Sequence, residues 1–569
     1  MTNGTTSGVF TVAELCQASA AGDMKRLNAI LTVAPHLVGV DTASFDEHRA
    51  LHHAVVNRQT EAVSALMAAG ADPNQGVYPH RDASTPLAMA RDRGFGDIIE
   101  TINEELERRR EANLCPNLTV SPEVVLLARK VEEGDVAGAM WDIHETPELA
   151  EACDENGNTV LHHAASHGYP GLVQALLTAN ADTGKTNLEG RTPLELAAEQ
   201  SVATDRRRAE GCFMAAGILM TAGAPRSLRT NVMLGDLQAV RQVAESHQDL
   251  FEPDIETETH LLGDAVRHNR YEMVKLLLDL GMDPDQRYRI QSLEEETYNW
   301  GEPLWIAAGD GMYDIAQLLL DRGADPNAAV YASGDPMSRA YNNRDERMKR
   351  LLYRYGGSMT PEGAALECDT SAAVMALKLK PELLEGILWG AACGGDPSVV
   401  GVCLRKLDWA LDDPRWYGLI IQPIRLWPCC PHRQYRDFDR SIFPDIVRMF
   451  LDHGVDPNVK GRRDTSLLHH IAATGKVWGE PVLREDERIE FARMFLEYGA
   501  SLDVRDTLLH STPLAWASRW RREDLVELYL EHGADPQPDG EPWTTPLAWA
   551  ERYGHASIAD RLREAGAVS

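Results

Sequence analysis

A unit of about 33 residues recurs along this chain, and this period restricts the possible folds more than any other feature. Its clearest copy, Thr159 to Asp182, reads TVLHHAASHGYPGLVQALLTANAD. Apolar residues stand at helical spacing on both sides of Gly168, which predicts two short helices joined by a tight turn. Helices of about ten residues are not stable alone. The unit therefore predicts a stack of similar units that bury their apolar faces against one another.

Further copies follow at the same period. The opening box Thr192-Pro193-Leu194 starts 33 residues after Thr159, and the box at Thr512 recurs 33 residues later at Thr545. A closing box ends several copies, as Gly70-Ala71-Asp72-Pro73-Asn74, Gly323-Ala324-Asp325-Pro326-Asn327, Gly454-Val455-Asp456-Pro457-Asn458 and Gly533-Ala534-Asp535-Pro536. In these boxes the sequence resembles the ankyrin-repeat family. The resemblance implies an all-α solenoid of helix-turn-helix units with projecting β-hairpin fingers.

The repeat pattern also predicts how the chain is divided. We expect a disordered N-terminal tail (1–10), N-terminal repeats (11–113), central repeats with a long finger at 285–302 (114–360), degenerate repeats (361–415), and C-terminal repeats with insertions at 425–441 and 475–486 (416–569). A solenoid grows by adding units, so a length of 569 residues does not require several globular domains.

The charge balance restricts the class of partner. The chain has 56 Lys and Arg against 87 Asp and Glu, a formal net charge of −31. Such an excess of negative charge disfavours nucleic acids and anionic membranes, and it favours a protein partner with a basic segment. No apolar run approaches the roughly 20 residues that span a bilayer, and the start MTNGTTSGVF does not have the pattern of a signal peptide. We therefore expect a cytoplasmic protein.

Cysteine and histidine usage predicts neither disulfides nor a metal site. The 9 cysteines are scattered without a CxxC motif, and Cys16, Cys212 and Cys403 lie on apolar helix faces, as buried reduced thiols do. The resemblance implies structural hydrogen-bonding roles for the opening-box histidines His52, His162 and His469. The histidines that follow them, His53, His163 and His470, belong to units that do not adjoin, so they are too far apart to bind one metal ion. No cofactor is expected.

Finger length gives the first set of candidate binding residues. The step from closing box to next opening box is eight or nine residues near the C-terminus, eleven from Asn74 to Thr85, and seventeen from Asp285 to Glu302. Aromatic and arginine side chains on projecting loops resemble binding hot spots. The candidates are Tyr78, His80 and Arg81 in the first long finger and Tyr288, Arg289, Tyr298 and Trp300 in the second. The alternative is packing over a neighbouring finger, which we favour for Trp300 because it adjoins the next helix.

The insertion after Trp416 gives the second set. It contains Trp427, Cys429, Cys430 and His432. Adjacent cysteines are poor ligands for one zinc ion, and no orienting motif supports a catalytic Cys–His pair, so a loop that covers a helix face is the simpler interpretation. The chain also contains no P-loop, GxSxG, HExxH or dinucleotide-binding glycine pattern.

These patterns predict a non-catalytic scaffold. The resemblance implies that fingers and first helices form a concave groove for a partner protein, and a monomer is the default expectation. One alternative is an enzyme or small-molecule binder with a pocket at 416–440, where Trp416, Trp427 and His432 would lie. Another is a self-associating array that uses its long fingers to bind a second copy.

Overall fold

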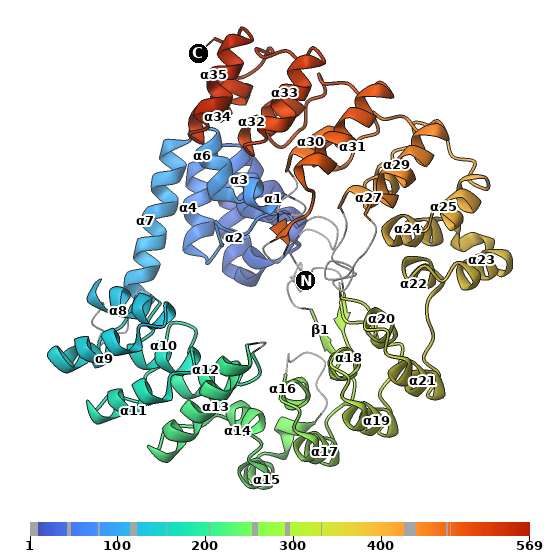
Figure 1. Cartoon of the computed structure of the whole chain (residues 1–569). Helices are drawn as coiled ribbons and strands as arrows, with labels where there is room; N and C mark the ends of the chain where they lie inside the picture. The colour runs from blue at the N-terminus through green and yellow to red at the C-terminus, as the bar shows by residue number, and fades with distance from the viewer. Residues whose placement is uncertain are drawn as a thin grey trace, which may run out of the picture. The chain divides into compact units, whose positions relative to one another are not determined.

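The computed structural model of the chain describes residues 10–41, 47–77, 80–113, 122–154, 156–203, 205–252, 260–290, 296–331, 333–425, 440–473, 476–477 and 480–568. The described residues form two compact units. Unit 1 takes in positions 1–75, 95–340 and 346–357, and unit 2 takes in positions 76–94, 341–345 and 358–569. Both are built from helical hairpins that follow one another along the chain (Figure 1). We call the first helix of each hairpin the box helix, because the opening box starts it in the regular copies of the repeat.

In unit 1 each box helix is followed by a second helix that returns beside it. The box helices are α1 Val12–Ala21, α3 Ala50–Val56, α8 Pro122–Glu132, α10 Val160–Ser166, α12 Pro193–Gln200, α14 Leu228–Leu234, α16 Leu261–Arg267, α18 Glu302–Gly309 and α20 Pro336–Asn342. The second helices are α2 Met24–Val33, α4 Thr60–Ala68, α7 Gly96–Asn113, α9 Val136–Glu145, α11 Pro170–Thr178, α13 Arg206–Thr221, α15 Leu237–Ser246, α17 Tyr271–Asp279, α19 Tyr313–Asp321 and α21 Glu346–Arg354. Short 3₁₀ helices stand at Pro35–Gly39, Pro147–Ala150 and Gln248–Phe251.

Unit 2 repeats this arrangement and includes one hairpin half from early in the chain. Its box helices are α6 Pro86–Asp92, α22 Pro361–Leu366, α24 Leu384–Gly394, α26 Arg415–Ile420 continued by α27 Gln422–Arg425, α30 Leu467–Ala473, α32 Pro513–Arg519 and α34 Pro546–Arg552. The second helices are α23 Thr370–Leu379, α25 Pro397–Leu404, α29 Ile442–Asp452, α31 Glu485–Glu497, α33 Glu523–Glu531 and α35 Ala556–Glu564. A one-turn helix, α5 Arg81–Ser84, precedes α6, and 3₁₀ turns stand at Pro381–Leu383, Arg462–Asp464 and Pro542–Thr544.

The opening box starts a helix for two local reasons. The threonine hydroxyl accepts a hydrogen bond from the backbone N–H three residues later, as Thr192 does from Glu195 at 3.2 Å and Thr545 does from Ala548 at 3.2 Å. This bond satisfies one of the backbone donors that have no partner within the helix. The proline that follows occupies the first helical position, where its missing N–H costs nothing.

Gly168 shows why the turn between the two helices needs glycine. Its φ is +74°, and a Cβ atom there would lie 2.6 Å from the carbonyl oxygen of Arg208 and 2.9 Å from the backbone nitrogen of Cys212. Both of these residues are in α13 of the next hairpin. The glycine therefore permits the left-handed turn and the close approach of neighbouring repeats at one position.

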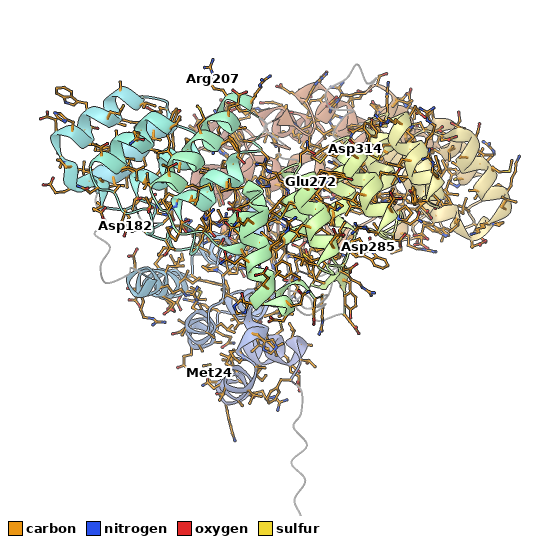
Figure 2. All side chains as sticks on the ribbon, turned by 90° about the horizontal axis from the view of Figure 1, so that it is seen from below. Met24, Asp182, Arg207, Glu272, Asp285 and Asp314 are labelled. Carbon is orange, nitrogen blue, oxygen red and sulfur yellow. The ribbon has the colours of Figure 1, made fainter. Side chains whose placement is uncertain are left out.

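Two short hairpins extend from the helical stacks. Tyr288–Arg289 (β1) pairs antiparallel with Tyr298–Asn299 (β2), and Tyr288 lies opposite Asn299. Lys476–Val477 (β3) pairs with Glu480–Pro481 (β4). In Figure 2, Asp182 and Asp285, which precede fingers of unit 1, lie on one side of that unit, whereas Arg207 and Asp314, near the starts of second helices, lie on the other. The fingers thus leave one edge of the stack.

The core of each unit runs from repeat to repeat. In unit 1, a cluster that includes Leu161, Leu176 and Leu219 joins α8 to α13, and in unit 2 a larger cluster includes Trp416, Trp516 and Trp549. The expected all-α fold of stacked helical hairpins is confirmed. Cys16, Cys212 and Cys403 are buried free thiols, as predicted. Over the part of the chain that the structure describes, no helix has both the length and the apolar character needed to cross a membrane.

Candidate functional site

The box histidine His162 fixes the frame of the site in unit 1. Its Nδ1 accepts a hydrogen bond from the backbone N–H of Thr159 at 3.0 Å, so the ring proton is on Nε2, which donates to the carbonyl of Arg191 at 3.1 Å. Burial lowers the pKa of His162 to about 4, so the ring stays neutral. His52 and His469 make the same pair of bonds, which confirms the structural role expected of the three histidines.

The next residue, His163, has a different role. Its Nε2 lies 2.9 Å from a carboxylate oxygen of Asp154, in the loop that precedes α10. The other Asp154 oxygen accepts the backbone N–H groups of Asn156 and Asn158 at 2.8 and 2.9 Å. Burial opposes ionisation of Asp154, but the His163 bond and these N–H groups outweigh it and hold its pKa below the usual value. The carboxylate therefore orders the loop and orients the imidazole together.

These groups line a cavity of about 630 Å³ on the face formed by the box helices. The lining residues come from α8, α10, α12 and the loops before them, and are Val125, Ala128, Arg129, Glu132, Asp154, Asn156, Asn158, His162, His163, Ser166, His167, Asn187, Leu188, Glu189 and Leu196. The side chains of Glu132 and Glu189 are 54% and 70% exposed. The cavity is therefore lined by two accessible carboxylates together with imidazole and amide groups and Arg129, and Glu189 also lies 3.4 Å from Arg191.

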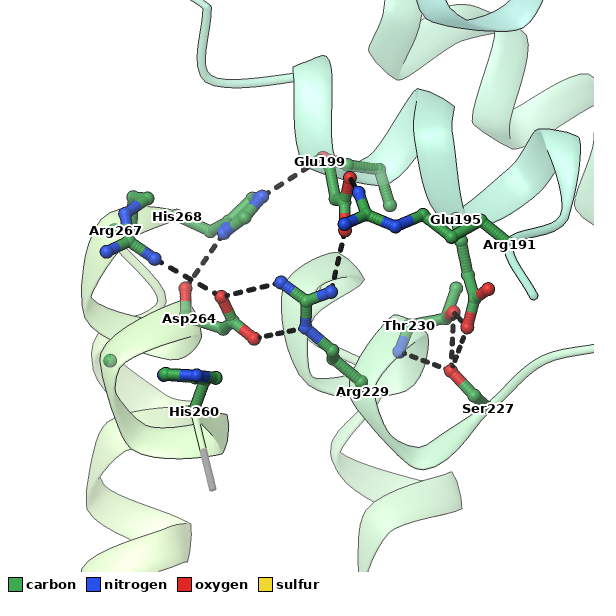
Figure 3. A network of polar contacts seen from close by, with 12 residues as sticks. Arg191, Glu195, Glu199, Ser227, Arg229, Thr230, His260, Asp264, Arg267 and His268 are labelled. Atoms are coloured by element: carbon green, nitrogen blue, oxygen red, sulfur yellow. Dashed lines mark hydrogen bonds and ion pairs between the residues drawn. The ribbon is translucent and has the colours of Figure 1, made fainter. Parts of the chain in front are cut away.

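A ladder of alternating charges continues from the cavity along the box helices (Figure 3). Arg191 pairs with Glu199, and the other Glu199 oxygen accepts from Arg229 at 2.6 Å. Arg229 also pairs with Asp264 at 2.7 Å. Arg267 then bridges Asp264 at 3.3 Å and Glu302 at 2.9 Å. The ladder links α12, α14, α16 and α18, so it couples four consecutive repeats through one surface.

The acidic side chains of the ladder are more buried than its arginine side chains. The side chains of Glu199, Asp264 and Glu302 are 14%, 2% and 16% exposed, whereas those of Arg229 and Arg267 are each 41% exposed. The hydrogen bond from His260 and the charge of Arg267 hold the pKa of Glu302 below its usual value against burial, and the bond to Asp264 raises the pKa of Arg229. The exposed part of the ladder is therefore a row of fixed guanidinium groups.

The hydroxyl and imidazole groups of this face do not form a nucleophile triad. Ser166 Oγ lies 3.2 Å from Nδ1 of His167, whereas the carboxylate of Asp154 bonds to the other imidazole, that of His163. A triad needs the carboxylate and the hydroxyl on the two sides of one imidazole. The arrangement is suited to hydrogen bonding and charge recognition.

The long finger at 285–302 places its four predicted binding residues in two environments. Tyr288 is 9% exposed, and its hydroxyl accepts from Asn299 at 2.8 Å while its ring lies edge-on to His260. Tyr298, Trp300 and Arg289 are half-buried. The exposed residue that sequence reasoning missed is Arg287, whose guanidinium lies 4.5 Å from the Tyr298 ring and 5.1 Å from the Trp300 ring. The stacked surface is thus Arg287, Tyr298 and Trp300.

The remaining predicted residues are dispersed. His80 is buried in unit 2, where its ring lies edge-on to Trp516 with centroids 4.8 Å apart. Arg81 is exposed at the start of α5. Trp416 is fully buried and donates its indole N–H to the carbonyl of Ala410 at 2.9 Å. Tyr78, Trp427 and His432 lie outside the described residues. Sequence reasoning also missed the charge ladder. The available signal was that Glu199 and Arg267 stand at the end of regular box helices, where the side chain is not required in the apolar core.

Two family models match the chain. Residues 144–197 match the family described as "Ankyrin repeats (many copies)", and residues 231–330 match the family described as "Ankyrin repeats (3 copies)". The first match includes α10 and the start of α12 at the cavity, and the second includes Asp264, Arg267 and Glu302 of the ladder together with the long finger.

Similar proteins share only part of their length with this chain. Palmitoyltransferase ZDHHC13 of Mus musculus is 33% identical over 109 residues, which cover 19% of this chain and 15% of that protein. Palmitoyltransferase Hip14 of Drosophila melanogaster is 29% identical over 155 residues, 26% of this chain and 22% of that protein. Protein PhlB of Serratia liquefaciens is 32% identical over 92 residues, 16% of this chain and 35% of that protein.

Proposed function

Since this chain belongs to the ankyrin-repeat family, we propose that it is a non-catalytic scaffold that binds a partner protein through the box-helix face and the long finger of unit 1. The observation that carries the proposal is the cavity beside the charge ladder, where hydrogen-bonding groups from several consecutive repeats lie on one surface. Such a surface suits a partner segment that runs across several repeats, with a basic side chain in the cavity and hydrogen-bond acceptors over the exposed guanidinium groups of Arg229 and Arg267.

The partner that we propose inserts a lysine or arginine into the cavity. Glu132 and Glu189 are its accessible charges, and the net charge of −31 attracts a basic segment from a distance. Arg287, whose guanidinium lies against the rings of Tyr298 and Trp300, forms with them a surface that can bury a large area at little entropic cost. We propose that the scaffold acts as a monomer in the cytoplasm, where the free thiols of Cys16, Cys153, Cys212 and Cys403 would persist.

A displayed library of random 12-residue peptides tests this proposal. We expect peptides selected on the full chain to be rich in lysine and arginine and to lose affinity at high salt. Glu132→Lys with Glu189→Lys should weaken the selected peptides at least tenfold. Glu245→Lys with Glu272→Lys is the matched control, since it makes the same change in charge on the exposed sides of second helices α15 and α17.

Equal affinity of all three proteins for the selected peptides would refute the cavity as the site. Selection of peptides without basic residues would refute the proposed chemistry of the partner. Light scattering on the same samples tests the proposed monomeric state. A mass twice that of one chain would exclude it.

A further inference from the structure

Box helix α6 is held against box helices from the far end of the chain. The carboxylate of Asp92, at the end of α6, accepts the Tyr553 hydroxyl at 3.1 Å and a guanidinium N–H of Arg519 at 3.3 Å. Arg552 donates to the backbone carbonyl of the same residue. The second helix that follows α6 in the chain is α7, which belongs to unit 1. Within unit 2, α6 is therefore held by side-chain contacts and not by a hairpin partner of its own.

A second carboxylate holds the other end of this segment. The indole N–H of Trp520 donates to Asp82 at 3.1 Å, and Arg519 lies 3.6 Å from the same carboxylate. The His80 ring, two residues earlier, packs edge-on against Trp516. The segment 80–94 thus presents one carboxylate before α6 and one at its end, and both contact Arg519.

The surface that receives these carboxylates is ordered by aromatic rings. The Arg519 guanidinium lies 4.4 Å from the ring centroid of Trp520, 4.9 Å from that of Tyr553 and 5.4 Å from that of Trp549. Three rings around one guanidinium restrict its rotamers and direct its N–H groups. With α6 in place, the Arg519 side chain is only 4% exposed.

The repeat register shows what the surface selects. Asp92, Arg519 and Arg552 each stand seven residues after the opening-box threonine of their own helix, Thr85, Thr512 and Thr545 respectively. The same position holds Glu199, seven residues after Thr192, and Glu199 pairs with Arg191 and Arg229 in unit 1. In both units this position forms an ion pair with another box helix; in unit 2 the Asp92 carboxylate pairs with Arg519 at the same position, and Arg552 bonds to the backbone carbonyl of Asp92.

We propose that the surface of Trp516, Arg519, Trp520, Trp549, Arg552 and Tyr553 is a binding site for a partner segment that forms two short consecutive helices, as α5 and α6 do, and presents one carboxylate from each, and that α5–α6 is the internal competitor for it. A partner segment with carboxylates placed as Asp82 and Asp92 are can make the same bonds. The internal segment is tethered, so its effective concentration is high and only a well-matched partner displaces it. This inference concerns unit 2 and does not depend on the function proposed for unit 1.

The test uses a fluorescent peptide with the sequence of residues 80–94 and the full chain. We expect weak binding to the wild-type protein, because the internal segment competes. Asp82→Ala with Asp92→Ala in the protein should raise the affinity for the peptide at least tenfold. A peptide with both aspartates replaced by asparagine should bind this variant at least tenfold more weakly than the original peptide.

Equal peptide affinity for wild type and a variant with a native far-UV circular dichroism spectrum would overturn the proposal. If the variant does not fold, hydrogen exchange on the wild-type protein decides: saturating peptide should accelerate exchange of amides 81–93, and unchanged protection would overturn the proposal. A dimer that forms in the wild type and dissociates on addition of peptide would show that the occupant is α5–α6 of a second copy, which overturns the partner-helix assignment.

Discussion

Asp92 and Arg519, separated by 427 positions in the sequence, form an ion pair with side chains that are 1% and 4% exposed. Burial raises the pKa of Asp92 even though Arg519, Tyr553 and Arg552 all oppose the shift. The pair is therefore closely balanced between the cost of removing charge from water and the gain from pairing it. Removing one partner leaves the cost without the gain.

This balance predicts a large effect from Arg519→Ala. We expect the free energy of unfolding of unit 2 to fall by about 3–5 kcal/mol, as measured by urea denaturation with tryptophan fluorescence. The control is Arg561→Ala, which removes an ion pair to Glu527. The Arg561 and Glu527 side chains are 35% and 50% exposed, so this substitution should lower the stability by less than about 1 kcal/mol. Similar losses for the two variants would show that burial of the Asp92–Arg519 pair contributes nothing.

The glycine between α10 and α11 predicts a pair of opposite results. Gly168→Ala forces a non-glycine residue to φ +74° and places its Cβ 2.6 Å from a carbonyl oxygen, so we expect a loss of about 2 kcal/mol or more in stability. Gly171→Ala lies two positions into α11 with open space around its Cβ and should be neutral or slightly stabilising, by less than about 1 kcal/mol. Melting temperatures of the two variants check the contrast, and a stable Gly168→Ala protein would contradict it.

The charge ladder of unit 1 predicts that its central arginine stabilises the fold. Arg229→Ala leaves Asp264, whose side chain is 2% exposed, with Arg267 as its remaining charged neighbour, and we expect a loss of about 1–3 kcal/mol. The control is Arg206→Ala, which removes an i,i+4 ion pair to Glu210. The Arg206 and Glu210 side chains are 91% and 62% exposed, so the expected loss of stability is less than about 0.5 kcal/mol. Chemical denaturation followed by circular dichroism measures both, and an equal effect would refute a structural role of the ladder.

His80 predicts a pH dependence of stability with a definite sign. Burial, together with the nearby charges of His469, Arg463 and Arg519, lowers its pKa to about 3, whereas the unfolded chain has a histidine pKa near 6.5. Below pH about 6.5 the unfolded state therefore binds a proton that the folded state does not, and stability falls as the pH is lowered toward about 3. The expected slope is about 1.4 kcal/mol per pH unit for this one group.

His80→Phe keeps an aromatic ring against Trp516 but cannot bind a proton. Urea denaturation of unit 2 at pH 9, 8, 6 and 5 should show that stability changes between pH 6 and 5 with a slope about one proton smaller than in wild type, and with the same slope as wild type between pH 9 and 8. Parallel pH profiles over the whole range would show that the ring is protonated in the folded protein.

The local structure of each repeat could be predicted from the sequence because it depends on interactions between residues that are close in the chain. Thr192 caps a helix through its own hydroxyl, Gly168 adopts a backbone conformation that other residues resist, and His162 bonds to groups within its own and the next repeat. The long finger was also predicted, since a seventeen-residue step leaves room for a hairpin, and β1 and β2 form there.

Single positions within the finger were harder to predict. Arg287 immediately precedes β1 and Tyr288 begins it; the Tyr288 side chain turns inward to Asn299, whereas Arg287 lies outside against Tyr298 and Trp300. Side chains alternate along a strand, and the frame of that alternation depends on where pairing begins. A sequence shows an aromatic residue beside an arginine without showing which of the two will face solvent.

The amino-acid sequence by itself determined the repeat, the helices, their caps and turns, and the histidines that hold adjacent units together, because each depends on residues within about one period of one another. Only the tertiary structure decided that Asp92 meets Arg519, that five charged residues of the box helices form a ladder, and that His80 is buried against Trp516. The reason is physical. A repeat position has the same local geometry in every unit, so its pattern cannot state which distant unit will supply the charge or ring that completes it.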